Sequence, residues 1–139
     1  FQKYSPNHFG DKRASRFRDW DNLKYWFRGV EKNCPWVNKV FLVIWGPSQI
    51  PDWIDTTNPK LRIVYHDEFI PLELQPVFNS RPIELFTCRI TDLSKNYIRC
   101  NDDCYFLNPS SAEMFFRNYS PCAISLFFLF SSLLQQSLH

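Results

Sequence analysis

Hydrophobic residues recur every three or four positions near the start of the chain, which predicts a helix that ends at about Lys32. The apolar face of this helix comprises Trp20, Leu23, Phe27 and Val30. Asp19 or Asp21 would cap it, because a carboxylate oxygen accepts a hydrogen bond from an unpaired backbone N–H of the first turn. The residue before Pro35 disfavours the α conformation, so the helix should end there.

Two apolar runs downstream of the helix have the composition of β-strands. The run from Val40 to Trp45 is continuously apolar, as expected of a strand that is buried on both faces. Leu61 to Tyr65 predicts a second strand, with His66 at its exit. A helix followed by two strands that are separated by a short helix or loop favours a layered α/β fold.

Prolines divide the second half of the chain into shorter elements. Phe69 to Phe78 contains two of them and should be an extended loop. Ser80 is a suitable N-cap for the next helix, because Pro82 then occupies its first turn. The remaining predicted elements are a helix from Pro82 to about Ile90, strands at Tyr97–Cys100 and Tyr105–Leu107, and a short helix from Ser110 to Arg117.

The bulk composition describes one domain or a piece of one. The 139 residues are 45% hydrophobic, which is enough for a core. We divide them into a polar lead-in at 1–18, an α/β region at 19–120 and an apolar tail at 121–139. The uncharged stretch from Ala123 to Leu134 is shorter than the roughly 20 residues of a membrane-spanning helix. The chain begins at Phe1 without a visible signal peptide, and we interpret it as an excerpt of a longer protein.

Net charge and cysteine spacing argue against several classes of partner and against a structural zinc site. A formal net charge of +2 is too small to indicate a nucleic acid or an anionic membrane surface as partner. None of the five cysteines forms a CxxC pair, which argues against a structural zinc site. We interpret Cys100 and Cys104 as semi-buried packing thiols.

Asn101-Asp102-Asp103, hereafter the acidic turn, carries the clearest candidate chemistry. Two adjacent carboxylates suit Mg²⁺, which proteins hold with one or two carboxylates together with substrate phosphates. In open α/β sheets, ligands bind just outside the carboxyl ends of the strands, where these aspartates are predicted to lie. The alternative is a plain turn, because Asn and Asp bond to their own backbone and tolerate unusual dihedral angles.

Many short motifs occur in a specific order from about Arg16 to Pro109. They are Arg16-Phe17-x-Asp19, Leu23-Lys24-Tyr25, Arg28-x-Val30-Glu31-Lys32, Pro35-Trp36-Val37, Gln49-Ile50-Pro51-x-Trp53, Asn58-Pro59, His66, Phe78-Asn79-Ser80, Ile83-Glu84, Leu93-Ser94 and Asn101-Asp102-Asp103-x-x-Phe106. Their order and spacing resemble the second conserved region of the Stealth family. That family includes bacterial capsular polysaccharide phosphotransferases and the eukaryotic lysosomal-enzyme N-acetylglucosamine-1-phosphotransferase. The family's other conserved regions are absent here, so we expect an incomplete fragment.

The resemblance implies transfer of a sugar-1-phosphate. The donor would be a nucleotide sugar, typically UDP-N-acetylglucosamine, the acceptor a hydroxyl of a glycan, and the released product UMP. The implied fold is a nucleotide-sugar-binding layered α/β sheet similar to that of metal-dependent glycosyltransferases. The implied location is cytoplasmic and membrane-peripheral in a bacterium, or the Golgi lumen in a eukaryote.

The resemblance also assigns expected roles to individual residues. Asp102 and Asp103 would hold Mg²⁺ or Mn²⁺ across the pyrophosphate, which neutralises the departing UMP. His66 would act as a base or ligand, and its alternative is a polar surface histidine. The expected substrate-binding residues are Arg16, Asp19, Arg28, Asn79, Ser80 and Asn101.

Several of these residues also have plain structural interpretations. Arg28 would be a solvated helix residue, Asp19 a helix cap, and Asn79 with Ser80 the cap of the next helix. Glu84 would support the site indirectly. Three large aromatic residues are interpreted as core packing, namely Trp36, Trp53 and Phe78.

Two other functions compete with sugar-1-phosphate transfer. A metal-dependent glycosyltransferase with a related acidic motif would release UDP instead of UMP. A non-catalytic fragment or interaction module would keep the fold without the complete site.

Overall fold

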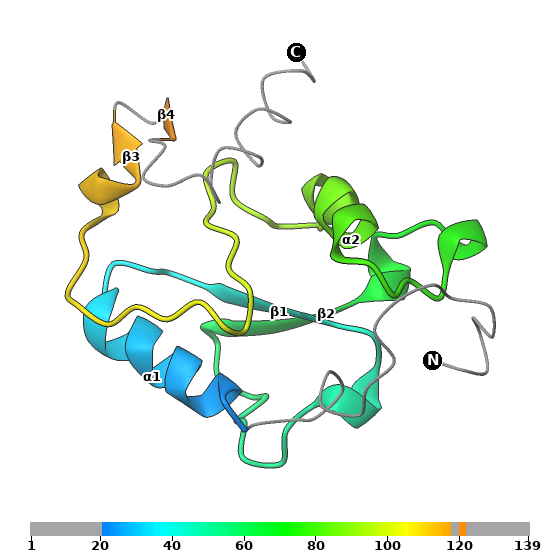
Figure 1. Ribbon diagram of the computed structural model, residues 1–139, viewed down its shortest axis with the longest axis horizontal. Helices are drawn as coiled ribbons and strands as arrows, with labels where there is room; N and C mark the ends of the chain where they lie inside the picture. Colours follow the sequence, from blue (N-terminus) through cyan, green and yellow to red (C-terminus); the bar gives the residue numbers. More distant parts are fainter. Residues whose placement is uncertain (1–20, 118–119, 122–139) are drawn as a thin grey trace.

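The computed structural model describes residues 21–117 and 120–121, and its centre is a pair of parallel strands. β1 (Val40–Ile44) and β2 (Leu61–Tyr65) run in register from Val40 opposite Leu61 to Ile44 opposite Tyr65. Figure 1 draws this pair between the helices α1 (Leu23–Asn33) and α2 (Ser80–Phe86). Helices around a parallel pair confirm the α/β class for the described residues.

Both strands lie where the apolar runs predict them, but β1 is less buried than expected. All five residues of β1 are only partly buried, so the prediction of a strand buried on both faces is wrong for the described chain. β2 contributes the fully buried Val64. The connection between the strands contains a single 3₁₀ turn, η2 (Pro47–Gln49), rather than an α-helix.

The main core lies between β2 and the segments that follow it. Its buried members are Val64, Phe69, Ile70 and Ile90. Partly buried residues from β1 and α2 pack against them, including Phe41, Val43, Ile83 and Phe86. The segment from Phe69 to Phe78, predicted to be extended, contains a 3₁₀ turn, η4 (Leu72–Leu74). Its first two residues, Phe69 and Ile70, are buried and belong to the core.

The helix termini differ in detail from the predictions. α1 begins after Asn22, and Asp21 does not cap it; Asp21 has a positive φ of 55° and pairs with Lys24. The predicted helix from Pro82 to Ile90 is instead α2 followed by the 3₁₀ turn η5 (Thr87–Arg89).

The predicted strands at Tyr97–Cys100 and Tyr105–Leu107 are wrong, because both segments are irregular. The second lies along α1 instead, as Figure 1 shows, and its backbone bonds to that helix rather than to a neighbouring strand. The predicted helix at Ser110–Arg117 reduces to η6 (Ala112–Met114), followed by β3 (Phe116–Arg117), which pairs antiparallel with β4 (Ser120–Pro121).

The described part of the chain contains no helix with the length and apolar character that crossing a membrane requires. The polar lead-in at 1–18 and the apolar stretch at 123–134 lie outside the described residues.

Candidate functional site

The acidic turn has the backbone geometry of a closed turn. The N–H of Cys104 donates to the carbonyl of Asn101 at 3.2 Å, and all three side chains of the turn are exposed. Within the described residues, no group of three or more His, Cys, Asp or Glu side chains could hold a metal ion. Asp102 and Asp103 therefore offer two carboxylates on their own, which fits Mg²⁺ if phosphate oxygens and water complete its shell.

The two cysteines beside the acidic turn differ in environment. Cys100 is partly buried, and burial is the main reason that its pKa rises to about 11. Its thiol is therefore protonated at neutral pH and serves as a packing group, as predicted. Cys104 is exposed, so the prediction of a semi-buried thiol is wrong for this residue.

His66 lies directly after β2, at the start of the 3₁₀ turn η3 (His66–Glu68). It is 6% exposed, so it is not a surface histidine. Its ring meets the rings of Trp45 and Phe69 edge-on, with centroids 5.9 and 6.1 Å away. Burial lowers the pKa of His66 although nearby Asp67 opposes the shift, so the imidazole is neutral at pH 7. Its Nδ1 atom is buried and has no hydrogen-bond partner among the described residues.

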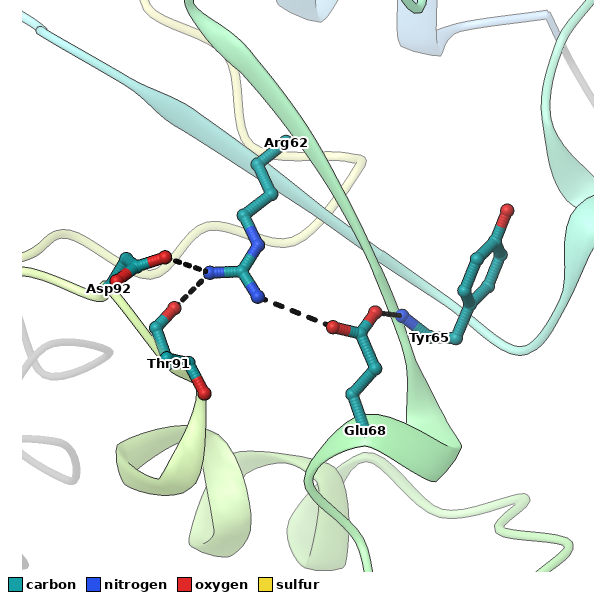
Figure 2. A network of polar contacts seen from close by, with 5 residues as sticks. All are labelled: Arg62, Tyr65, Glu68, Thr91 and Asp92. Atoms are coloured by element: carbon teal, nitrogen blue, oxygen red, sulfur yellow. Dashed lines mark hydrogen bonds and ion pairs between the residues drawn. The ribbon is translucent and has the colours of Figure 1, made fainter.

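An arginine network holds the turn that carries His66 (Figure 2). Arg62 of β2 donates to the carbonyl of Thr91, to Asp92 Oδ2 at 3.1 Å and to Glu68 Oε2 at 3.3 Å. The other carboxylate oxygen of Glu68 accepts the backbone N–H of Tyr65 at 2.7 Å. One guanidinium thus ties the end of β2 to the segment after η5, because its planar fork can satisfy several acceptors at once.

The start of α2 confirms one structural interpretation and corrects another. Asn79 is the N-cap, and its Oδ1 accepts the N–H of Arg81 at 3.0 Å. Ser80, predicted as the cap, is instead the first helical residue and is exposed. Glu84 of α2 pairs with Arg99, which lies two residues before the acidic turn.

The remaining predicted residues lie on separate elements or outside the described residues. Arg28 is exposed on α1, with its guanidinium carbon 5.7 Å from the centre of the Tyr25 ring. None of the hydrogen bonds described above joins Arg28, His66, Asn79, Ser80 or the acidic turn to another member of this set. Arg16 and Asp19 lie outside the described residues.

The interpretation of the large aromatic residues as core packing holds only in part. Trp53 and Phe78 are 44% and 47% exposed, so neither is a core residue of the described chain. Trp36 is partly buried, and its indole N–H donates to the carbonyl of Ser110 at 2.7 Å.

Several residues that shape this region escaped the sequence analysis. Arg62 stands in an otherwise apolar strand, and a charge at such a position indicates a specific partner. Gly29 and Asn33 on α1 lie against the segment after the acidic turn. The glycine is at least visible in the sequence, because an isolated glycine within a helical pattern costs helix stability relative to alanine. Asn33 carries no such signal.

Comparisons with known proteins identify the family. Residues 16–123 match the family described as Stealth protein CR2, conserved region 2. Over 129 residues the chain is 38% identical to the capsular polysaccharide phosphotransferase eps5J of Streptococcus thermophilus, in a match that covers 90% of this chain and 53% of that protein.

Two further relatives are streptococcal. The capsular polysaccharide phosphotransferase WcwK of Streptococcus pneumoniae is 40% identical over 113 residues, which cover 81% of this chain and 34% of that protein. The receptor polysaccharide phosphotransferase WefC of Streptococcus oralis is 47% identical over 100 residues, which cover 72% and 30%. The chain thus spans between 30% and 53% of the length of these relatives.

Proposed function

Because the chain belongs to the Stealth family, we propose that it forms part of an enzyme that transfers a sugar-1-phosphate from a UDP-sugar to a hydroxyl of a glycan. The names of its relatives support phosphotransfer on capsular or receptor polysaccharides. The proposed donor is UDP-N-acetylglucosamine, and the proposed second product is UMP. These bacterial relatives favour the cytoplasmic alternative over the Golgi lumen.

The observation that carries this proposal is the exposed pair of carboxylates in the acidic turn. Asp102 and Asp103 would hold Mg²⁺ or Mn²⁺, and the ion would neutralise the charge that develops on the departing UMP. Asn101 would hydrogen-bond to the donor from the same turn. Phosphoryl transfer depends mainly on positioning and charge stabilisation, so a small set of correctly held groups is sufficient for it.

At phosphorus, the proposed reaction forms one bond and breaks one, and a proton is transferred to a base. The acceptor hydroxyl oxygen attacks the phosphorus that bears the sugar, the bond from that phosphorus to the UMP oxygen breaks, and the hydroxyl proton leaves to a base. His66 is the candidate base, since it is neutral at pH 7 and its Nδ1 has no partner among the described residues. Because that atom is buried, this role requires η3 to rearrange when substrate binds.

The proposed fold extends the parallel pair into a larger nucleotide-sugar-binding sheet of the glycosyltransferase type. β1 and β2 each have one strand neighbour in the described residues, and unpaired strand edges are usually covered in a complete protein. Arg16, Asp19 and Arg28 are proposed donor contacts. Asn79, the N-cap of α2, and Ser80, its first residue, are proposed contacts to sugar or phosphate.

Binding of the donor tests the proposal directly. The purified protein is titrated calorimetrically with UDP-N-acetylglucosamine in Mg²⁺ and again in EDTA, alongside an Asp102→Asn/Asp103→Asn double variant. We expect binding that requires both the metal and the carboxylates. Asp52→Asn is the matched control, because Asp52 is also an exposed turn aspartate.

The products separate the remaining alternatives. UMP release supports sugar-1-phosphate transfer, whereas UDP release would identify a metal-dependent glycosyltransferase. A folded protein that binds no donor with or without Mg²⁺ would contradict the proposal and favour a non-catalytic interaction module.

A further inference from the structure

Three hydrogen bonds hold the segment that follows the acidic turn against the last residue of α1 and against Trp36, just beyond it. The Asn33 side-chain amide donates to the carbonyl of Phe106. The backbone carbonyl of Asn33 accepts the N–H of Ser110 at 2.7 Å, and the Trp36 indole donates to the Ser110 carbonyl at 2.7 Å. We call this set of contacts the α1 clamp.

Asn33 is the central member of the α1 clamp. It is 5% exposed, and it is a polar residue among the most buried positions of the described chain. A buried amide needs a hydrogen-bond partner, because leaving it unpaired costs free energy. The carbonyl of Phe106 supplies that partner from a point 73 residues along the chain. The contact therefore reports a tertiary arrangement and not a local turn.

Two further features hold the same segment close to α1. A Cβ atom at Gly29 would lie 3.1 Å from the Phe106 carbonyl oxygen, which is tighter than ordinary van der Waals contact. The rings of Phe106 and Trp36 both meet Phe115, with centroids 6.1 and 5.7 Å away. Hydrogen bonds to backbone groups and aromatic contacts thus act on the stretch from Phe106 to Phe115.

The acidic turn lies between the α1 clamp and a second anchor. Arg99, two residues before the turn, pairs with Glu84 of α2. Phe106 follows Asp103 after three residues, and three residues span at most about 10 Å of extended chain. The turn has one internal backbone hydrogen bond, from Cys104 to Asn101, and the two anchors lie on either side of it along the chain.

We propose that Asn33 is a positioning residue that sets where the carboxylates of the acidic turn lie, by holding the Phe106 carbonyl against α1. The metal-related part of this inference rests on the function proposed above. Groups that orient metal ligands usually matter to metal affinity even though they never touch the ion. Asn33 would act in this way through the backbone.

The test compares Asn33→Ala with a matched control. Gln75→Ala removes the same kind of bond, because the Gln75 amide also donates to a partly buried backbone carbonyl, that of Ile70 at 2.8 Å. Trp36→Phe is a milder variant that deletes one bond of the α1 clamp and keeps an aromatic ring. It keeps the proposal testable if Asn33→Ala fails to fold.

Two readouts are measured on each folded protein. The first is the ¹⁵N order parameter at Asp102 and Asp103, which we expect to fall from about 0.85 to below about 0.6 in Asn33→Ala and to remain unchanged in Gln75→Ala. The second is Mn²⁺ affinity in the presence of UDP-N-acetylglucosamine. We expect it to weaken about tenfold in Asn33→Ala, the lower end of the range for residues that support metal ligands.

Gly29→Ala separates positioning from general stability. Alanine favours the helix more than glycine does, yet the new methyl group must displace the Phe106 carbonyl. We expect weaker Mn²⁺ binding without a lower melting temperature. If the affinities of all variants follow melting temperature alone, Asn33 is a fold residue and the proposal is wrong.

The outcomes also separate this proposal from the proposed function. Unchanged order parameters in both α1-clamp variants would overturn the positioning role. In another outcome, the order parameters fall in Asn33→Ala, but the unsubstituted protein binds neither Mn²⁺ nor the UDP-sugar. That outcome would refute the proposed function and the metal-related part of this inference. Asn33 would remain an anchor of the turn.

Discussion

The parallel strand pair and the segment around the acidic turn show opposite relations between sequence pattern and structure. In the strand pair, the apolar run Leu61–Tyr65 predicts a strand, and β2 has the same bounds. Around the acidic turn, Tyr97–Cys100 has a similar composition, yet it is irregular. The strand pair is held by a backbone ladder and a core, whereas the acidic turn is held by side chains that reach in from α1 and α2.

This difference teaches where stability and candidate chemistry lie in the molecule. The core beside β2 supplies packing, and the described candidate residues of the acidic turn are exposed. A substitution in the first region should therefore act on the free energy of unfolding, and a substitution in the second on ligand binding. Four predictions test that separation, beginning with the largest effect on stability.

Phe69→Ala should cause the largest loss of stability. The side chain is 3% exposed and belongs to the core cluster with Val64. Truncation of a buried phenylalanine typically costs about 3–5 kcal/mol, because transfer energy is lost and a cavity remains. The measurement is urea unfolding followed by circular dichroism. Leu72→Ala is the control, because Leu72 is 75% exposed, and an equal loss in both would contradict the assignment of the core.

Arg62→Leu should cost a smaller amount, about 1 kcal/mol, because it removes the shared donor of Figure 2 from acceptors that are exposed and regain water. The effect is measured by the same unfolding experiment. Arg28→Leu serves as the control, since Arg28 is exposed on α1. If Arg62→Leu lowers the free energy of unfolding no more than Arg28→Leu does, the arginine network does not stabilise the packing of β2 against the segment after η5.

Stability should fall as the pH drops below the ordinary pKa of histidine, 6.5. Burial lowers the pKa of His66 in the folded state, so the unfolded chain binds the proton first. The contribution of neutral His66 to the free energy of unfolding is fully present above pH 6.5 and is lost as the pH falls towards the pKa of the folded state. Its size is about 1.4 kcal/mol for each unit by which the folded and unfolded pKa values differ.

The pH dependence is measured by thermal unfolding between pH 5 and 8, compared with His66→Gln. That variant retains the chain's two other histidines, so it isolates the titration of His66. An unchanged pH profile in the variant would exclude His66 as the source.

The Asp102→Asn/Asp103→Asn variant should change stability least, by no more than about 0.5 kcal/mol, because both side chains are exposed and make no core contact. The same substitution should abolish metal-dependent donor binding. Thermal unfolding is the measurement that completes the comparison. A large destabilisation would mean that the acidic turn is a structural element, in contrast to its proposed role.

The candidate site was partly predictable, for reasons that differ among its residues. The acidic turn is visible as two adjacent aspartates, and Asn79 is visible as a capping residue because its short side chain reaches a nearby backbone N–H. The burial of His66 was missed, since a polar residue at a strand exit normally faces water. Arg62 bonds to Thr91 and Asp92, and Asn33 bonds to Phe106. These partners lie 29 or more residues away along the chain, so local patterns do not indicate them.

The sequence by itself determined the helix α1, the two strands and the family, because hydrophobic spacing, strand-forming residues and ordered motifs are properties of neighbouring positions. Only the tertiary structure determined that the predicted strands within Tyr97–Leu107 do not form. Strand formation requires a partner edge, and in the described residues the backbone carbonyl of Phe106 bonds instead to Asn33 on α1. Whether such a carbonyl bonds to a neighbouring strand or to a helix side chain depends on which distant segments pack against it.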